Sequence, residues 1–174
     1  MAKRVLLVRG GSLGRNTGLG AAHHNLVDLL ESGKVDGWQL AGICEYPLEK
    51  TSNPISRIWQ RWFAHPKRVA KEINRLVSNN QCDLVHITDQ EQGHLMPKNC
   101  PVPGIITVHD LFHLFPEHLR FSDEVIAVGD TKPGIVRRRD LQKLKAGINR
   151  ANHLLCNSKH TLEAAEQHLS LIHI

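Results

Sequence analysis

Short apolar runs alternate with amphipathic segments along the first part of the chain. Residues 5–8 form a continuous apolar run that ends at Gly10 and Gly11, which predicts a central parallel strand buried on both faces. From residue 20 to residue 30 the apolar positions recur at helical spacing, and Gly33 follows as a stop signal. Residues 39–44 are a second predicted strand. The chain therefore begins as strand, glycine-rich loop, helix and strand.

The best amphipathic pattern in the chain follows these elements. Five apolar residues fall at i, i+3, i+4, i+7 and i+8 and so share one face of a predicted helix, with Arg57 and Arg61 away from it. They are Ile55, Ile58, Trp59, Trp62 and Phe63. Such a stripe indicates a core or domain contact, which is the more frequent use, or else a membrane-facing helix. Pro66 starts a further predicted helix that runs to about Val77.

The rest of the chain continues the alternation of strands and helices. Residues 83–88 and 104–108 are predicted strands, and residues 135–150 are a predicted helix. A short strand over residues 153–156 precedes a last helix over residues 160–169, with Ser158 as its candidate cap. This order predicts an α/β fold of the Rossmann-like type, with a doubly wound parallel sheet. In such sheets ligands bind outside the carboxyl ends of the strands.

Length and composition indicate one soluble globular domain over residues 1–174. The chain is long enough for one well-buried core and short for two. Its formal net charge is +5, but the basic residues are scattered and aromatic residues make up only 5%, so no nucleic-acid partner is expected. The charge fits a solvated basic surface or an anionic ligand.

The cysteines and the apolar runs indicate in which cellular compartment the protein is expected. The four cysteines include no C-x-x-C pair, which indicates reduced cysteines in a cytoplasmic protein. Arg9 ends the first apolar run too early for a signal peptide. No segment approaches the length of about 18–20 apolar residues that spans a bilayer, so membrane contact is expected only as a peripheral one.

The loop of residues 10–20 is the first candidate site, because it holds five glycines in eleven positions. It leads into a predicted helix N-terminus, where free amides and the helix dipole favour an anion such as a phosphate. The candidate binding residues are Gly11, Gly14, Asn16, Thr17, Gly18 and Gly20. The loop lacks the G-K-[ST] step of a Walker loop. It fits a dinucleotide fingerprint poorly, because His23 stands where a small residue is needed, although Glu45 could hold a ribose.

Two later strand ends carry the other candidate residues. The predicted strand over residues 104–108 delivers His109 and Asp110 to the ligand-facing edge, where a histidine can hydrogen-bond a sugar hydroxyl or a phosphate. A structural role for His109 is the alternative. Asn157 and Ser158 follow the last predicted strand and lie at the same edge.

The histidines of this region do not predict a metal site. His109, His113 and His118 lie near Asp110, but Pro116 interrupts any helix that would align them. Neither H-E-x-x-H nor H-x-H-x-D-H occurs in the sequence. A metal-dependent hydrolase is therefore a less favoured alternative.

Four motifs occur in an order that resembles a known family. They are T-G-L-G at residues 17–20, D-L-V-H at 83–86, T-V-H-D-L at 107–111 with P-E at 116–117, and L-L-C-N-S at 154–158. Together they resemble the N-terminal domain of family 4 glycosyltransferases. The resemblance extends from Val5 to about Leu169.

The resemblance implies a retaining, metal-independent glycosyltransferase of the GT-B fold, of which this chain would be the acceptor-side half. Its partners would be a nucleotide-sugar donor and a sugar or lipid-linked acceptor, and it would need no cofactor. His109 matches the family histidine that contacts the donor sugar, and with Asp110 it forms the expected catalytic pair. The glycine loop would approach the donor phosphates. Catalysis would rest on placing the reactants and stabilising the leaving diphosphate.

Two departures from the family limit what this chain is expected to do alone. Ala21 and Ala22 stand where many relatives carry large polar or aromatic residues. The donor-site signature of two glutamates eight positions apart is absent, so the C-terminal donor domain is expected to be missing and the fragment inactive by itself. Whether residues 170–174 are native stays open. The competing prediction is a stand-alone Rossmann-like module that binds a nucleotide or phosphate, in the cytoplasm or at the inner face of the membrane.

Overall fold

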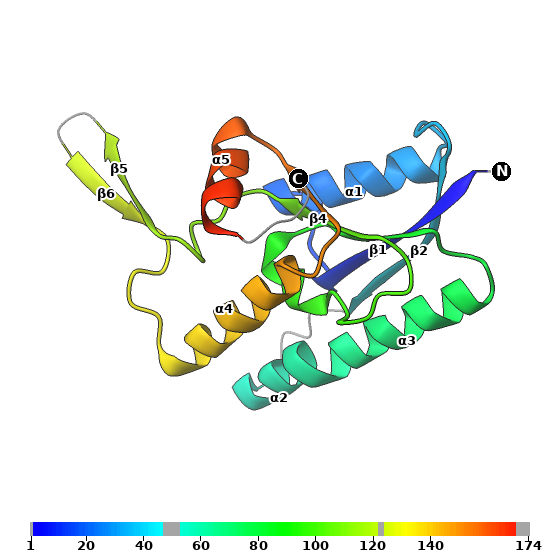
Figure 1. The fold of residues 1–174 in the computed structure, drawn as a ribbon, viewed down its shortest axis with the longest axis horizontal. Helices are drawn as coiled ribbons and strands as arrows, with labels where there is room; N and C mark the ends of the chain where they lie inside the picture. The colour runs from blue at the N-terminus through cyan, green and yellow to red at the C-terminus, as the bar shows by residue number, and fades with distance from the viewer. Residues whose placement is uncertain (1, 47–52, 122–123, 170–174) are drawn as a thin grey trace.

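A five-stranded parallel sheet forms the centre of the molecule (Figure 1). The structure is a computed structural model, and it describes residues 2–46, 53–121 and 124–169. The strand order is β2-β1-β3-β4-β7. The strands are β1 (Lys3–Gly11), β2 (Trp38–Tyr46), β3 (Leu84–Ile87), β4 (Gly104–Val108) and β7 (His153–Cys156). All five were predicted, with ends that differ by no more than a few residues.

Helices cover both faces of this sheet, as Figure 1 shows. The helices are α1 (Gly18–Glu31), α2 (Pro54–Trp59), α3 (His65–Ser78), α4 (Ile135–Ile148) and α5 (Lys159–His168). Val5 and Leu7 of β1 pack with α1, because successive strand residues face opposite sides. Leu6 and Val8 therefore belong to the larger core, which α3 and α4 complete. The predicted α/β fold with a doubly wound parallel sheet is confirmed.

The helix predicted from Pro66 to about Val77 is confirmed as α3, but it continues directly from the helical segment before it. Residues 54–78 form a continuous helical run, in which a π-helical turn, η1 (Gln60–Ala64), joins α2 to α3. In this turn the amide of His65 donates to the carbonyl of Gln60, five residues back. Pro66 has no amide hydrogen and would clash with the preceding turn of an α-helix, so a wider turn accommodates it without ending the helix.

A short 3-10 helix, η2 (Gln90–Leu95), follows β3 and packs directly on α4. The two backbones approach so closely at Gly147 that a Cβ there would meet the carbonyl oxygen of Gly93. This contact brings the first residues after β3 against the side of α4. It sets the position of Glu91, which forms an ion pair with Arg137 of α4.

Two strands in the structure were not predicted. β5 (Glu117–Phe121) and β6 (Glu124–Val128) form an antiparallel hairpin that projects away from the central sheet (Figure 1). The hairpin makes no ladder with that sheet among the described residues, and Val125 and Ile126 are exposed. β6 is exposed along most of its length, and a strand without a buried face carries little of the alternation that marks a strand in sequence.

Candidate functional site

A cavity of about 190 Å3 opens at the carboxyl ends of β4 and β7. Residues from β5 and α5 and from the segments that follow β4 and β7 line it. They are His109, Asp110, Leu111, Phe112, Glu117, Asn157, Ser158, His160, Thr161 and Ala164. Four of the predicted site residues are thus brought together: His109, Asp110, Asn157 and Ser158.

Hydrogen bonds at the start of α5 hold the wall of this cavity. The hydroxyl of Ser158 accepts from the amide of Thr161 at 3.1 Å, which confirms the predicted N-cap. The Thr161 hydroxyl in turn donates to the carbonyl of His109 at 3.2 Å. Helix α5 is therefore tied to the end of β4, and the two strand ends keep a fixed spacing.

The cavity carries two carboxylates and no Lys or Arg among its lining residues. Asp110 accepts a hydrogen bond from the amide of Phe112 at 3.3 Å. Glu117, the first residue of the hairpin, lies 3.2 Å from Nε2 of His160. Two carboxylates without a lysine or arginine disfavour a phosphate group and suit hydroxyl groups, which donate to carboxylate oxygens.

His109 is held by groups of its own chain. Its amide donates to Oε1 of Gln90 at 2.9 Å, and its Nε2 lies 3.3 Å from the carbonyl oxygen of Thr88. When that hydrogen bond forms, Nε2 carries the proton, because a carbonyl oxygen only accepts. The ring therefore links the end of β4 to the end of β3, which is the structural role weighed as the alternative.

The glycine loop does not line this cavity, and its expected binding role stays a prediction. Gly11, Gly14, Asn16, Thr17, Gly18 and Gly20 are all absent from the lining residues. The loop follows β1, and β3 lies between β1 and β4. Since neighbouring strands are about 4.8 Å apart, the loop starts about 10 Å from the end of β4.

The loop is instead folded onto the start of α1. The hydroxyl of Thr17 accepts from the amide of Gly20 at 3.0 Å and caps the helix. A Cβ at Gly20 would meet the carbonyl oxygen of Gly14, so the close contact requires glycine there. Nothing lies within 4 Å of a Cβ built at Gly18, where the loop faces open space.

Buried polar residues gather beneath this loop, at the carboxyl ends of β1 and β3. Arg9 is 2% exposed, and its neighbourhood includes the buried side chains of His23, Thr88 and Asp89. Nδ1 of His23 lies 3.1 Å from the Thr88 hydroxyl. Burial, with a smaller contribution from the Arg9 charge, lowers the pKa of His23 to about 4. His23 is therefore a neutral core residue, which explains how it fits where a small residue was expected.

Arg9 itself lacks a complete set of partners. Its Nε donates to the carbonyl of Gly11 at 3.4 Å, and its Nη1 has no hydrogen-bond partner among the described residues. Burial lowers the pKa of Arg9, although Asp89 and Glu45 act in the opposite direction. Burial also raises the pKa of Asp89, whose Oδ1 accepts from the amide of Glu91. In the sequence Arg9 only ends an apolar run, and no local signal marks this group of buried polar residues.

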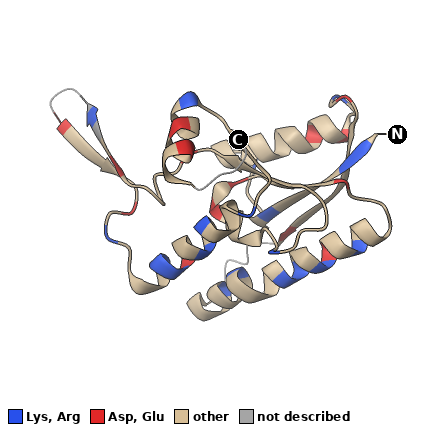
Figure 2. Ribbon diagram, viewed as in Figure 1, with Lys and Arg blue, Asp and Glu red and all other residues tan. Residues whose placement is uncertain are grey.

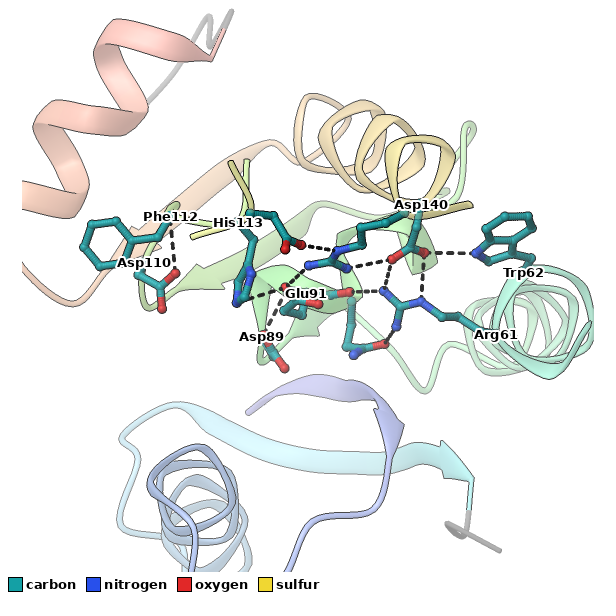
Figure 3. A network of polar contacts seen from close by, with 11 residues as sticks. Arg61, Trp62, Asp89, Glu91, Asp110, Phe112, His113 and Asp140 are labelled. Carbon is teal, nitrogen blue, oxygen red and sulfur yellow. Dashed lines mark hydrogen bonds and ion pairs between the residues drawn. The ribbon is translucent and has the colours of Figure 1, made fainter. Parts of the chain in front are cut away.

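A second group of charged residues was also missed, and it is fully paired (Figure 3). Arg61 binds Asp140 through two hydrogen bonds, from Nε to Oδ1 at 2.9 Å and from Nη2 to Oδ2 at 3.1 Å. Trp62 Nε1 also donates to Asp140 at 2.9 Å. Arg137 pairs with Asp140, with Asp130 and with Glu91 at 2.9 to 3.1 Å. We call these residues the ion-pair network; it joins η1, η2 and the first turns of α4.

Strong hydrogen bonds keep the network ionised. Burial alone would raise the pKa of Asp140, but the hydrogen bonds and charge of Arg61, together with the Trp62 hydrogen bond, lower it overall. Asp140 is thus a carboxylate surrounded by donors. Because the charges of the network are paired with one another, its role is structural.

Four of the five residues of the apolar stripe are exposed, which corrects the core interpretation for them. Ile55 is 79% exposed, Trp59 60% and Phe63 57%. Trp62 is the exception, because it is half-buried and donates to Asp140. Arg61, expected to lie away from the stripe, is also half-buried in the ion-pair network. The helical run therefore presents Arg61 and Trp62 to α4. Among the described residues no helix is both long and apolar enough to cross a bilayer.

The histidines near the hairpin lie apart. His113 is 3.5 Å from Glu91 and joins the edge of the ion-pair network. His118 lies in β5. Across the described part of the chain, no three His, Cys, Asp or Glu side chains are grouped as metal ligands.

Comparisons with known proteins give no family for this chain. No family model matches it, and no curated protein does. Among solved structures it is similar to the signal receiver domain of a modulated diguanylate cyclase from Desulfovibrio desulfuricans G20, which is described as an example of alternate folding. The match covers 96% of this chain and 92% of that one, at 13% identity and a TM-score of 0.36.

The glycosyltransferase function is therefore corrected: this similar solved structure is a signal receiver domain and not a glycosyltransferase. A structural similarity with so low an identity and TM-score does not assign the receiver domain's function to this chain. The resemblance to the N-terminal domain of the family, the missing second domain and the enzyme class stay predictions. Residues 170–174 lie outside the described residues.

Proposed function

We propose that the chain is a Rossmann-like binding module that holds a small, uncharged, hydroxyl-bearing molecule in the cavity after β4 and β7. The convergence of Asp110, Glu117 and Asn157 on one cavity, beside the ring of Phe112, is the observation that supports it. Polar groups that converge in a cavity with an aromatic wall are typical of small-molecule sites. Carboxylate and amide groups accept hydrogen bonds from hydroxyls, and the ring covers an apolar face of the ligand.

A panel of uncharged hydroxyl compounds tests this proposal. D-ribose, D-glucose, myo-inositol and adenosine are added to the protein, and binding is measured by saturation-transfer NMR and calorimetry. At least one is expected to bind. In Ala164→Leu, whose added side chain fills the cavity, its affinity should fall at least tenfold. Ala146→Leu makes the same change at an exposed position of α4 and should bind as the wild type does.

Two outcomes would show that the cavity is not the binding site. Binding of none of the four compounds contradicts the proposal. So does binding that persists in both Ala164→Leu and Glu117→Gln, since the ligand would then sit elsewhere.

A second candidate function is peripheral docking on an anionic membrane. Four apolar residues of the stripe are exposed, and Ile135 and Val136 at the start of α4 are exposed as well. α4 lies beside η1, because Arg137 and Asp140 reach the same network as Arg61. These apolar residues form what we call the apolar helix surface: Ile55, Ile58, Trp59, Phe63, Ile135 and Val136.

Basic residues surround the apolar helix surface. No Asp or Glu occurs between residues 53 and 71, and Asp140, inside the ion-pair network, is the single acidic residue between 131 and 147. Figure 2 shows Lys and Arg along α3 and α4. Lys143 lies 4.2 Å from the ring centroid of Trp62 and 5.1 Å from that of Phe63. Aromatic and aliphatic side chains beside lysine and arginine are the composition of helices that lie on anionic lipid.

Vesicle co-sedimentation tests this second candidate. The protein is expected to sediment with phosphatidylglycerol-containing vesicles more than with phosphatidylcholine vesicles, and less at high salt. Trp59→Glu with Phe63→Glu should abolish binding, whereas Val125→Glu on the exposed hairpin should not. If the protein instead forms dimers that Trp59→Glu dissociates, the surface is a protein interface and the membrane candidate is wrong.

A further inference from the structure

Arg9 is a buried arginine without an ion-pair partner among the described residues. Arg9 is 2% exposed, and no carboxylate oxygen of the described residues lies within 4.0 Å of its guanidinium. Its Nη1 has no hydrogen-bond partner in the same part of the chain. A guanidinium stays charged in a protein, and a buried charge is costly unless it is paired. Asp89 and Glu45 act on this charge from beyond ion-pair distance, so an anion in direct contact is the partner that this position lacks.

The position of Arg9 is also one where ligands bind in sheets of this kind. The order β2-β1-β3-β4-β7 reverses direction between β1 and β3. In open α/β sheets the crevice outside the strand ends at such a reversal is the usual ligand site. Arg9 lies near the carboxyl end of β1, and Asp89 follows β3.

The start of α1 lies above the same strand end. Nε of Arg9 donates to the carbonyl of Gly11, at the beginning of the loop that leads into α1. Thr17 caps the amide of Gly20, and no acceptor among the described residues faces the amides of Gly18 and Leu19. Free amides and the helix dipole attract an anion at this end of a fourteen-residue helix.

We infer that Arg9 and the amino end of α1 together form a binding site for a small anion, a phosphate or carboxylate group. A guanidinium binds either group through paired N–H donors, and the amides of the loop complete its coordination. The glycine at position 18 leaves the approach open, because a Cβ there would have no neighbour within 4 Å. The site is separate from the proposed cavity, which is lined by different residues and carries no lysine or arginine.

Inorganic phosphate is the first probe, at constant ionic strength maintained with chloride. The melting temperature of the wild type should rise with phosphate concentration, and calorimetry should give a saturable isotherm. Sodium acetate is titrated in the same way, so that the response identifies a phosphate or a carboxylate site. In Arg9→Met the response should disappear, while the variant melts no lower than the wild type in anion-free buffer.

Three further variants make the test specific. Arg9→Lys keeps the charge and should retain a weaker response. Arg15→Met removes an exposed arginine of the same loop, paired with Asp28, and should respond as the wild type does. Ala164→Leu should also keep the full response, so that a failure of the cavity proposal leaves this site intact. Absence of any response in the wild type, or an unchanged response in Arg9→Met, would overturn the inference.

Discussion

Two groups of arginines lie in the interior of this protein, and they differ in how their charge is balanced. Arg61 and Arg137 are bound by Asp140, Asp130 and Glu91, so every guanidinium faces carboxylates. Arg9 is more deeply buried, yet among the described residues its guanidinium makes a single long hydrogen bond, to a carbonyl. The first group holds three elements of the fold together. The second leaves an unbalanced charge at a strand end where ligands bind.

The difference in pairing indicates different roles: Arg61 and Arg137 stabilise the fold, whereas Arg9 is available to bind a ligand. A buried charge that its own chain pairs needs nothing more, and its removal damages the fold. A buried charge without a partner lowers the stability of the fold, and a bound ligand of opposite charge can offset that loss. Changing one member of each group should therefore have opposite effects.

The largest effect is expected from Asp140→Ala. This change removes the acceptor of Arg61, Arg137 and Trp62 and leaves two half-buried guanidinium groups underpaired. The free energy of unfolding, measured by urea denaturation, should fall by about 3 kcal/mol. Asp130→Ala is the control, because Asp130 is more exposed and binds Arg137 alone; it should cost less than about 1 kcal/mol. Equal costs for both variants would show that the network does not act as a unit.

The next effect concerns the loop above Arg9. In Gly20→Ala the new methyl group meets the carbonyl oxygen of Gly14, so the loop must move, and unfolding should become easier by about 2 kcal/mol. Gly18→Ala places the same methyl group in open space and should change stability by less than about 0.5 kcal/mol. Thermal denaturation of the two variants measures the difference. A neutral Gly20→Ala would mean that the loop is not packed as described.

A smaller change, of opposite sign to that of Asp140→Ala, is expected for Arg9→Met in anion-free buffer. The variant removes an unpaired buried charge and keeps an apolar side chain of similar length, so the free energy of unfolding should rise by about 1 kcal/mol. Arg61→Met should instead destabilise, because it leaves Asp140 with fewer donors. Urea denaturation of the two methionine variants compares them directly. A loss of stability in both variants would show that Arg9 stabilises the fold as Arg61 does.

The smallest effect is expected at His23. Burial and then the Arg9 charge lower its pKa in the folded protein to about 4, from an unfolded value of 6.5. The unfolded chain therefore binds more protons between these values, so the stability that His23 contributes is full above pH 6.5 and is lost as the pH falls toward 4. In Arg9→Met the pKa of His23 should rise by a few tenths of a unit, since burial remains. An NMR titration of the ring protons checks it, and an unchanged pKa would place the two side chains too far apart to interact.

The elements of the central sheet were predictable because their signals are local. Each buried strand is a short apolar run, and the helices on both faces carry apolar residues at helical spacing. The alternation of the two imposes the doubly wound order. His109, Asp110, Asn157 and Ser158 could be placed at one edge for the same reason, because residues that directly follow parallel strands lie at one end of the sheet.

What the sequence by itself determined, then, is the α/β class, the order of its main elements and four residues of the cavity. The tertiary structure decided the rest. It turned Arg61 inward and most of the apolar stripe outward, because a partner for Arg61 exists only where α4 brings Asp140 beside η1. It separated the glycine loop from the cavity by inserting β3 between β1 and β4. It also buried Arg9 without an ion-pair partner, since the pairing of a charge depends on residues distant in the chain that only folding brings together or keeps apart.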